Sequence, residues 1–400
     1  FAQMERAPRP AARMILLLAL GTAFALFMLT STSTQQQRIA DAANFRVGAD
    51  FSGSVAPPPQ GQSLTQAEAA YLRTSGVTSA TLGYSAAART QDGANDNIFA
   101  VDTATFAQTA SWSPLYSDQP LSSLMSLLAS HRADASARDV VYAIVDDTTA
   151  KAMSLSVGSS FIIPTSDGFN THMIVAAIVH AIPGMYTDGE NFGFLVDYQS
   201  YTTVYTKDSG GGTISPNFAW LQTRSDAASL ASARKAYPTL EDRRAVLDEL
   251  QSDALHINLI SLLGAGVVVG LLLALAGTLF SAWLNASGRL TSFAVLRALG
   301  MIPRKIAAVL LWELGSICAA ALALGVGLYF LLAQLVAPIF PITDFIDGID
   351  SRMPSQVVTP PLLVAITLAG ITAVCVIALA LMARLVSRPS LAQTLRLNED

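Results

Sequence analysis

The sequence predicts an α-helical membrane domain of four transmembrane helices, with a large α+β extracytoplasmic domain inserted between helices 1 and 2. Three observations support this fold class. The chain of 400 residues is 52 % hydrophobic and only 13 % charged, with a mean hydropathy of +0.45. Its excess apolar residues gather in four long runs. The segment between the first two runs has the mixed composition of a folded domain, so a disordered chain and a purely cytosolic globule are both excluded.

The first apolar run, residues 14–31, is about long enough to cross a hydrocarbon core of roughly 30 Å. A signal-peptide core is the alternative interpretation. The run is longer than a usual signal-peptide core, and no small-residue cleavage site follows it cleanly, so we expect a retained helix. The three later runs are also long enough to span, and they cover residues 259–284, 306–337 and 362–386.

The distribution of charge sets the orientation, because short basic flanks stay in the cytoplasm. Basic residues dominate an amphipathic start (1–13), the link 285–305 and the tail 387–400. The segment from 31 to 258 instead carries 13 basic and 22 acidic residues, and the loop 338–361 has one Arg against three Asp. We therefore expect a multi-pass protein of a bacterial cell membrane, with both termini in the cytoplasm.

The exported domain, residues 32–238, mixes short alternating runs with short amphipathic segments, which predicts an α+β domain large enough for its own core. The predicted strands cover residues 45–51, 77–84, 140–145, 160–163, 173–180, 192–196 and 220–223. The predicted helices cover residues 66–73, 121–132 and 227–236.

Residues 239–258 are expected to form a helical stalk. The segment starts with Thr239 and Asp242 at capping-box spacing and continues with Val246, Leu247 and Leu250 on one face. It runs almost without interruption into the second span. Such a connection could carry motion between the exported domain and the membrane.

Two spans carry small residues at four-residue spacing, which lets helix backbones approach closely in lipid. Packing within the chain and contact with a second permease half both fit this pattern. The two sets are Gly266, Gly270, Ala274 and Thr278, and Gly315, Ala319, Ala323 and Gly327.

Glu313 is the one ionisable residue deep in a span. A functional acid and a partnered or snorkelling carboxylate that fixes the helix are the two interpretations. We favour the second, because no basic partner for a proton relay lies in the neighbouring spans.

The sequence offers little chemistry of its own. Its four histidines lack metal-ligand spacing, its two cysteines lie inside apolar runs, and there is no G-x-x-x-x-G-K-[ST] loop. We therefore predict no catalytic, cofactor-binding or metal-binding residues, no cofactor and no enzyme activity. If nucleotide energy drives the protein, another subunit must bind the nucleotide. The net charge of −5 argues against nucleic acid as a partner.

The link between the second and third spans is the most informative segment. A short helix ending at Gly300 would be half apolar and half basic, and Pro303 suits the first turn of the next helix. On physical grounds alone, this helix could lie on lipid headgroups or dock into a groove on a soluble partner.

The segment FAVLRALGMIPRKIAAVLLWE resembles the signature of FtsX-like and MacB-like ABC transporter permeases. In that family the link contacts the ATPase subunit, so the resemblance implies that residues 289–300 form the coupling element. Glu313 matches an acid often found early in the third span, whereas Ser292 replaces a common acid and removes the basis for a salt bridge there. The residues assigned to ATPase coupling are Arg289, Phe293, Leu296, Arg297, Ala298, Gly300 and Arg304.

The likeness covers nearly the whole chain. IVHAIPGMYTDGENFGFLVDY is similar to part of the exported domains of long permeases, EDRRAVLDELQSDAL to their stalks, and RPSLAQTLRLNED to their C-termini. The first span resembles the fifth span of ten-span versions. The resemblance therefore implies the C-terminal half of a longer permease.

The leading hypothesis is a permease subunit of an ABC transporter. A partner ATPase would drive movement of the exported domain, for export or extraction of an amphiphilic or peptide-like substrate. The expected partners are the ATPase, a second permease half and membrane lipids. The alternative is an ATPase-driven mechanotransmission or signalling protein that moves no cargo. A membrane-anchored binding module without an ATPase is disfavoured by the basic link.

Overall fold

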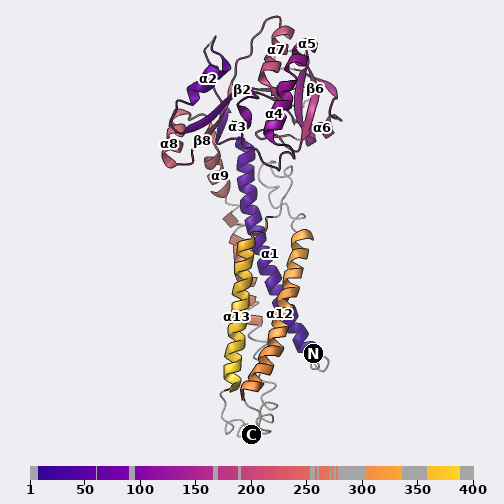
Figure 1. The fold of residues 1–400 in the computed structure, drawn as a ribbon, viewed down its shortest axis with the longest axis vertical. Coiled ribbons are helices and arrows are strands. Elements are labelled where there is room, and N and C mark those ends of the chain that lie inside the picture. Colours follow the sequence, from indigo (N-terminus) through magenta and orange to yellow (C-terminus); the bar gives the residue numbers. More distant parts are fainter. Residues whose placement is uncertain are drawn as a thin grey trace. The chain divides into compact units, whose positions relative to one another are not determined.

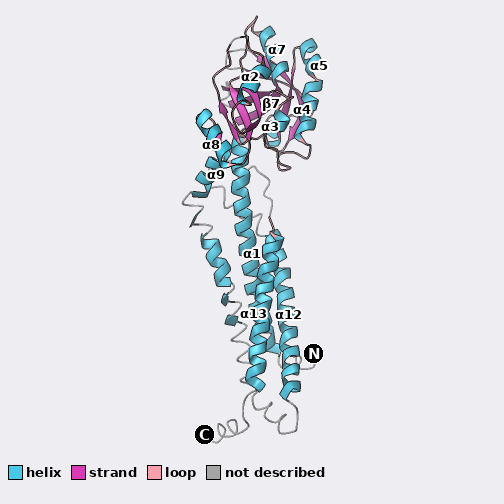
Figure 2. Ribbon diagram, turned by 60° about the vertical axis from the view of Figure 1, so that its left-hand side comes forward, coloured by secondary structure: helices cyan, strands magenta, loops and turns pink. Residues whose placement is uncertain are grey.

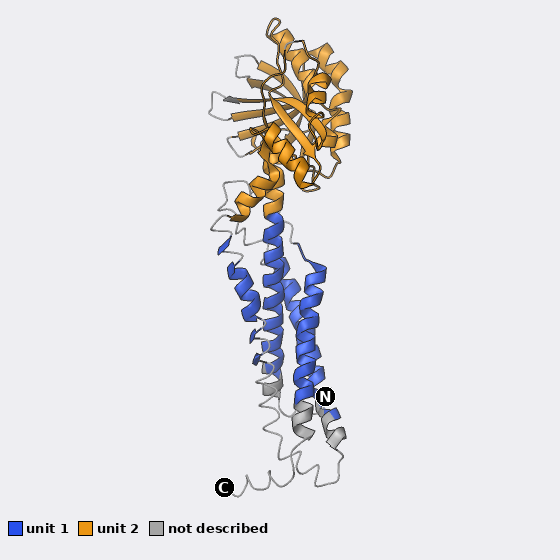
Figure 3. Ribbon diagram, turned by 90° about the vertical axis from the view of Figure 1, so that its left-hand side faces the viewer, with its two compact units in different colours: residues 1–38, 254–341, 355–400 blue, residues 39–253, 342–354 orange. Residues whose placement is uncertain are grey.

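The computed structural model separates the chain into two compact units (Figure 3). Unit 1 comprises residues 1–38, 254–341 and 355–400, and unit 2 comprises residues 39–253 and 342–354. The structure describes residues 8–59, 61–89, 95–164, 170–187, 191–252, 257–258, 261–270, 272–273, 276–277, 303–335 and 358–387.

Helix α1, Pro8–Val47, contains the first apolar run and continues through a polar segment rich in helix-forming Gln and Ala. It ends where Gly48 takes a left-handed backbone conformation with φ of 68°. The Gly48 N–H donates to the Asn44 carbonyl at 2.8 Å, which closes the last turn. The predicted strand 45–51 is therefore wrong at its start: the helix stops at Gly48, and the strand begins only at Phe51.

Three helices in the described part of the chain are long and apolar enough to cross a membrane: Met14–Val47 of α1, Leu311–Leu335 of α12 (Pro303–Leu335), and Pro361–Leu381 of α13 (Pro361–Ser387). They are coloured by sequence position in Figure 1. A shorter apolar helix, Ser261–Gly270, lies within the predicted second span. The predicted count of four spanning helices is not confirmed, since much of residues 259–284 falls outside the described residues.

The unit 1 helices pack through apolar side chains with a few buried polar ones. The Thr30 and Tyr329 hydroxyls share a hydrogen bond of 2.9 Å between α1 and α12, and both residues are 2 % exposed. Apolar partners surround this bond, with Ala23, Leu26, Tyr329 and Ala333 in one cluster. Polar contacts of this kind hold helices together in lipid, where burial of apolar surface contributes little.

Glycines mark where α1 meets its neighbours. A Cβ on Gly325 of α12 would lie 2.9 Å from the Ala19 carbonyl oxygen, and one on Gly270 would lie 2.9 Å from the Phe24 ring. Gly266 approaches Met28 in the same way. Gly266 and Gly270 of the predicted second span therefore pack within the chain, as the first of the two interpretations has it, whereas Ala274 and Thr278 lie outside the described residues.

The small-residue set of the third span behaves differently. Among the described residues, nothing lies within 4 Å of where a Cβ would stand on Gly315 or Gly327. Ala319 and Ala323 are exposed. Close packing of α12 against α1 uses Gly325 instead, a residue that the four-residue spacing did not select.

Unit 2 is built on a nine-stranded mixed sheet with strand order β5-β6-β4-β7-β3-β2-β8-β1-β9 (Figure 2). The pairs β3/β7 and β4/β6 are parallel and the others are antiparallel. The strands are β1 Phe51–Ser54, β2 Val77–Arg89, β3 Asn95–Val101, β4 Val141–Asp146, β5 Ser160–Pro164, β6 Asn170–Val179, β7 Asn191–Asp197, β8 Phe218–Thr223 and β9 Glu241–Asp242.

Helices cover both faces of this sheet. One face packs against α3 and α4 around Trp220 and Phe99. The other packs against α2 and α8 around Leu221 and against α6 and α7 around Phe194. The helices are α2 Leu64–Tyr71, α3 Phe106–Thr109, α4 Leu121–Ser130, α5 Arg132–Arg138, α6 Asp147–Ala152, α7 Tyr198–Asp208, α8 Ala227–Ala236 and α9 Arg243–Ser252.

Most predicted elements of the exported domain are confirmed within a few residues, and helix 227–236 matches α8 at both ends. Strand β3 and helices α3, α5, α6 and α7 were not predicted. The stalk helix begins at Arg243 rather than Thr239, because Glu241 and Asp242 pair with β1 as strand β9. Asp242 caps the helix instead, with its Oδ1 accepting from the Arg244 N–H at 2.9 Å.

The Thr30 to Tyr329 bond gives a first testable expectation. Tyr329→Phe keeps the ring but leaves the Thr30 hydroxyl without this partner, and should destabilise the bundle by about 0.6 kcal/mol. Unfolding of the membrane domain in mixed detergent micelles measures this cost. Phe330→Leu, at a side chain 56 % exposed, is the matched control and should have a smaller effect. A Tyr329→Phe protein as stable as the wild type would contradict the role given to this bond.

Candidate functional site

Most of the residues predicted to couple to an ATPase lie outside the described residues: Arg289, Phe293, Leu296, Arg297, Ala298 and Gly300. Arg304 lies in the first turn of α12. Glu313 lies further along α12 and is half-buried. The structure therefore does not bring these residues into one described site, and the assignment of ATPase-coupling residues stays a prediction.

A second candidate site lies where unit 2 begins and ends along the chain. We call residues 39–52 and 240–252 the root of unit 2. Here the last turns of α1 pack against α9 through one apolar cluster. The buried members of the cluster are Ile39, Ala43, Val47, Val246 and Leu250. The pattern of Val246 and Leu250 recognised in the sequence therefore does face a partner, and that partner is α1.

Asp50 is the polar centre of the root. Its carboxylate, 3 % exposed, accepts from the Thr223 N–H at 3.0 Å and lies 2.9 Å from Arg243 Nη2 and 3.3 Å from Arg244 Nη1. The Arg243 N–H also donates to the Asp50 carbonyl at 3.0 Å. The Asp50 carboxylate thus links the start of β1 to β8 and to the first turn of α9.

The Arg243 guanidinium extends this network to α1, because its Nη1 donates to Asn44 Oδ1 at 2.9 Å. Outside it, Arg234 of α8 lies 2.6 Å from the Asp242 carboxylate, which is 6 % exposed. Arg46 pairs with Glu241 at 3.3 Å on the surface. The ion pairs made by the buried carboxylates of Asp50 and Asp242 hold one geometry, and removing one partner of such a pair strongly lowers the free energy of unfolding. The root is therefore one connected polar and apolar unit.

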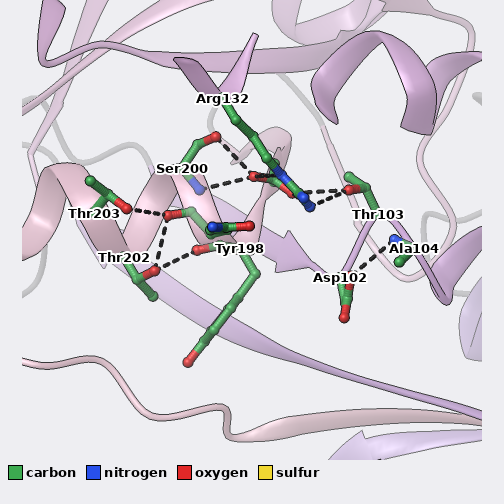
Figure 4. A network of polar contacts seen from close by, with 10 residues as sticks. Asp102, Thr103, Ala104, Arg132, Tyr198, Ser200, Thr202 and Thr203 are labelled. Carbon is green, nitrogen blue, oxygen red and sulfur yellow. Dashed lines mark hydrogen bonds and ion pairs between the residues drawn. The ribbon is translucent and has the colours of Figure 1, made fainter. Parts of the chain in front are cut away.

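A second polar network, between β7, α5 and α7 of unit 2, is shown in Figure 4. Asp197, 1 % exposed, ends β7 and caps α7, with its Oδ2 accepting from the Ser200 N–H at 2.9 Å. Arg132 of α5 lies 2.7 Å from the same carboxylate and also donates to Thr103. All its contacts are internal, so we interpret this network as structural.

Two buried acids of unit 2 have raised pKa values. Glu68 accepts from the Leu82 N–H at 2.9 Å and from the Thr105 hydroxyl at 3.1 Å, and burial raises its pKa to about 7. Asp96 of β3 is 1 % exposed, and neither of its carboxylate oxygens has a hydrogen-bond partner. Burial raises the pKa of Asp96 to about 6.

One cavity of about 280 Å³ lies beside α2. Its lining is mostly apolar and includes Pro57, Leu82 and the stacked rings of Tyr71 and Tyr237. Nothing among its described contacts selects one ligand. In the part of the chain that the structure describes, no group of three or more His, Cys, Asp or Glu side chains could hold a metal ion.

Sequence reasoning missed Asp50, Glu68 and Asp96. The acid-base run Glu241 to Arg244 was a usable signal, since four consecutive charges at the start of an amphipathic helix need partners. Its main partner, Asp50, lies 193 residues away and could not be found without the fold. The buried acids had no signal at all, because nothing in a local sequence pattern distinguishes a buried Asp from an exposed one.

The chain thus combines apolar helices long enough to cross a membrane with a large mixed α/β domain. Residues 264–391 match the family model described as FtsX-like permease C-terminal. This part of the chain is therefore similar to the C-terminal region of FtsX-like permeases, the family that the link segment resembles.

Two solved structures are similar to the chain. The periplasmic region of MacB from Actinobacillus actinomycetemcomitans is 10 % identical, with a TM-score of 0.28, covering 52 % of this chain and 95 % of that one. The extracellular domain of the noncanonic ABC-type transporter YknZ from Gram-positive bacteria is 12 % identical, with a TM-score of 0.24, covering 50 % and 93 %. No curated protein matches the sequence.

Removing the charge of Asp50 should destabilise the protein strongly. Asp50→Asn leaves two guanidinium groups beside a neutral amide and should lower the free energy of unfolding by about 3 kcal/mol. Urea unfolding of the full chain in detergent, followed by tryptophan fluorescence, measures the loss. Glu249→Gln, at a side chain 70 % exposed on the same root, should change it by less than about 0.5 kcal/mol. Equal effects of the two substitutions would contradict the central role of Asp50.

Asp96 gives a prediction about pH. Its pKa rises from 3.8 in the unfolded chain to about 6 in the fold, so the stability it contributes is full below pH 3.8 and is lost as pH rises through about 6. Asp96→Asn cannot ionise, so its advantage over the wild type should grow by about 2 kcal/mol between pH 4 and pH 7. Urea titrations at both pH values test this. A constant difference between the two proteins would show that Asp96 does not titrate in this way.

Proposed function

We propose that this chain is the permease subunit of an ABC transporter, in which a separate ATPase moves unit 2 for export or extraction of an amphiphilic or peptide-like substrate. The observation that carries the proposal is the family match over residues 264–391, which includes the whole predicted coupling element. A permease of this family implies an ATPase partner. The P-loop that the sequence lacks would then belong to that partner.

The root supports the proposed movement of unit 2. The chain enters unit 2 through the end of α1 and leaves it through α9, and these two helices are joined by one apolar cluster. The Asp50 carboxylate links the start of α9 to β1 and β8. A displacement of either helix would therefore be passed to the sheet rather than absorbed in a loose connection.

The exposed small-residue set of α12 supports the second permease half as a partner. Ala319 and Ala323 are exposed, and Gly315 and Gly327 have open space at their Cβ positions among the described residues. Helices in lipid associate closely over such surfaces. The proposal also places both termini in the cytoplasm and has residues 285–305 face the ATPase.

The substrate class rests on the spans. The buried polar residues of α1 in the described bundle are uncharged, among them Thr22, Thr30 and Gln35, so a path for a small ion finds little support. Mechanotransmission without cargo is the second candidate, since the root would carry motion equally well in that case. Transfer of labelled lipid or peptide by the reconstituted complex, measured together with its ATPase activity, separates the two functions.

Deleting residues 289–300 tests the coupling element. The deletion should abolish co-purification of the ATPase expressed from the same host, because the proposed contact is lost. Arg38→Gln, outside the link, is the control and should retain the ATPase. Retention of the ATPase by the deletion variant, with the protein still inserted in the membrane, would refute docking at this link.

A further inference from the structure

Helix α2, at the edge of unit 2, forms one wall of the cavity of about 280 Å³ (Figure 1). Of its eight residues, only Ala67 and Glu68 are buried, at 3 % and 4 % exposure, whereas Leu64 and Tyr71 are half-buried. The Ala67 methyl group packs in a small apolar cluster with Leu82. The other buried side chain is a carboxyl group, so the attachment of α2 to the sheet depends strongly on the state of one titratable residue.

The Glu68 carboxyl group joins α2 to β2 and to the turn before α3. Its Oε1 accepts from the Leu82 N–H at 2.9 Å and from the Thr105 hydroxyl at 3.1 Å. The Thr105 hydroxyl in turn accepts from Thr81 Oγ1 at 3.0 Å. Pairing of β2 with β3 begins at Gly83, so Glu68 takes up a backbone donor just beyond the end of that ladder. These contacts attach α2 to the sheet through a single oxygen atom.

This geometry suits a neutral carboxyl group. A protonated acid keeps its carbonyl oxygen as an acceptor for both donors and carries the proton on the other oxygen. Ionisation instead places a charge where the residue is 4 % exposed, and among the described residues no Lys, Arg or His forms an ion pair with Glu68. Burial therefore raises the pKa of Glu68 to about 7, although the hydrogen bond from Leu82 lowers it.

The groups around Glu68 do not offset its charge. Asp102, in the turn after β3, acts on Glu68 through its field and makes ionisation less favourable. Tyr71 of α2 and Tyr237 after α8 stack on each other, with ring centroids 5.1 Å apart. Tyr84, two residues along β2 from Leu82, stacks on a ring of α7. An ionised Glu68 is thus better accommodated in water than in the position that holds α2 against the sheet.

The segment that carries α2 has one fixed end and one open end. Gly76 has a φ of 93°, and a Cβ there would lie 2.2 Å from the Ser229 Cβ, so close packing against α8 holds this point. Gly61 has a φ of 86°, and nothing described lies within 4 Å of its Cβ position. Outward movement of α2 would separate Tyr71 from Tyr237 and remove one wall of the cavity.

We propose that α2 is a pH-controlled lid over this cavity, which is closed while Glu68 is neutral and is released when its carboxyl group ionises. On release the carboxylate becomes hydrated, and the proton passes to water. The apolar wall that includes Ala67 and Leu82 becomes accessible. All the contacts involved lie within unit 2, so the inference does not depend on the proposed transport function.

The direction of the pH effect follows from the two positions of the lid. The pKa of Glu68 is about 7 when the lid is closed, and it returns to its ordinary value of 4.5 when the lid is open. Closure is therefore strongest below pH 4.5 and is weakened as the pH rises through about 7. The equilibrium constant for opening should rise about 40-fold between pH 5 and pH 7 and level off above about pH 8.

Hydrogen exchange of the full chain in detergent, resolved by residue and corrected for the intrinsic effect of pH, measures this opening. Protection of the α2 amides should fall about 40-fold between pH 5 and pH 7. The Leu82 amide of β2 should follow them, because Glu68 is its acceptor. At pH 7 both should exchange faster than the amides of α8, since the lid opens without unfolding of the domain.

Two variants separate the charge of Glu68 from other effects of pH. Glu68→Gln keeps an acceptor at Oε1 but cannot ionise, so protection of its α2 amides should be the same at both pH values. Glu249→Gln, at a side chain 70 % exposed, is the matched control and should keep the wild-type response.

Three results would overturn the proposal. The first is unchanged protection of the wild-type α2 amides between pH 5 and pH 7. The second is an equal fall in protection in Glu68→Gln. The third is exchange of the α2 amides only together with those of α8, which would mean that α2 opens by unfolding of the whole domain. If Glu68→Gln fails to fold, the wild-type comparison of α2 and Leu82 with α8 still decides.

Discussion

The carboxylate of Asp50 is the interaction on which the root of unit 2 depends. A buried charge is stable only when its lone pairs are satisfied, and here Arg243 Nη2 and the Thr223 N–H and hydroxyl donate hydrogen bonds to it, while Arg244 adds an ion pair at 3.3 Å. The same contacts fix where the sheet begins relative to α9. Because Arg243 also reaches Asn44, the end of α1 is held by the same charge network. A single electrostatic requirement therefore connects α1 and β1 with β8 and α9, which lie about 170 to 195 residues further along the chain.

Unit 1 is organised by a different constraint, close approach in lipid. Gly325 and Gly270 each bring a neighbouring helix against α1, and the Thr30 to Tyr329 bond adds a directional contact. The small residues that remain open, such as Gly327, lie on the other side of α12. This asymmetry accords with a bundle that uses one helix face inside the chain and offers another to a partner, as proposed for the second permease half.

The sequence predicted the elements whose signal is local. In strand β2 the apolar residues Ala80, Leu82 and Tyr84 alternate with small or polar ones. Helix α8 is bounded by Asp226, which caps it, and by Tyr237. The end of α1 was missed because Phe45 and Val47 read as strand residues, while Gly48 was the real boundary. Strand β3 was missed because it starts with Asn95, Asp96 and Asn97, although pairing with β2 and β7 overrides that polarity. The root could not be predicted, since its charges pair across most of the domain.

Hydrogen exchange of the full chain under increasing denaturant tests the central account most directly. If the root is one unit held by Asp50, the amides of residues 39–47 and those of α9 should open with the same free energy, and both should move together with the amides of β1. Opening of α9 at a markedly lower free energy, with residues 39–47 and β1 still protected, would contradict it.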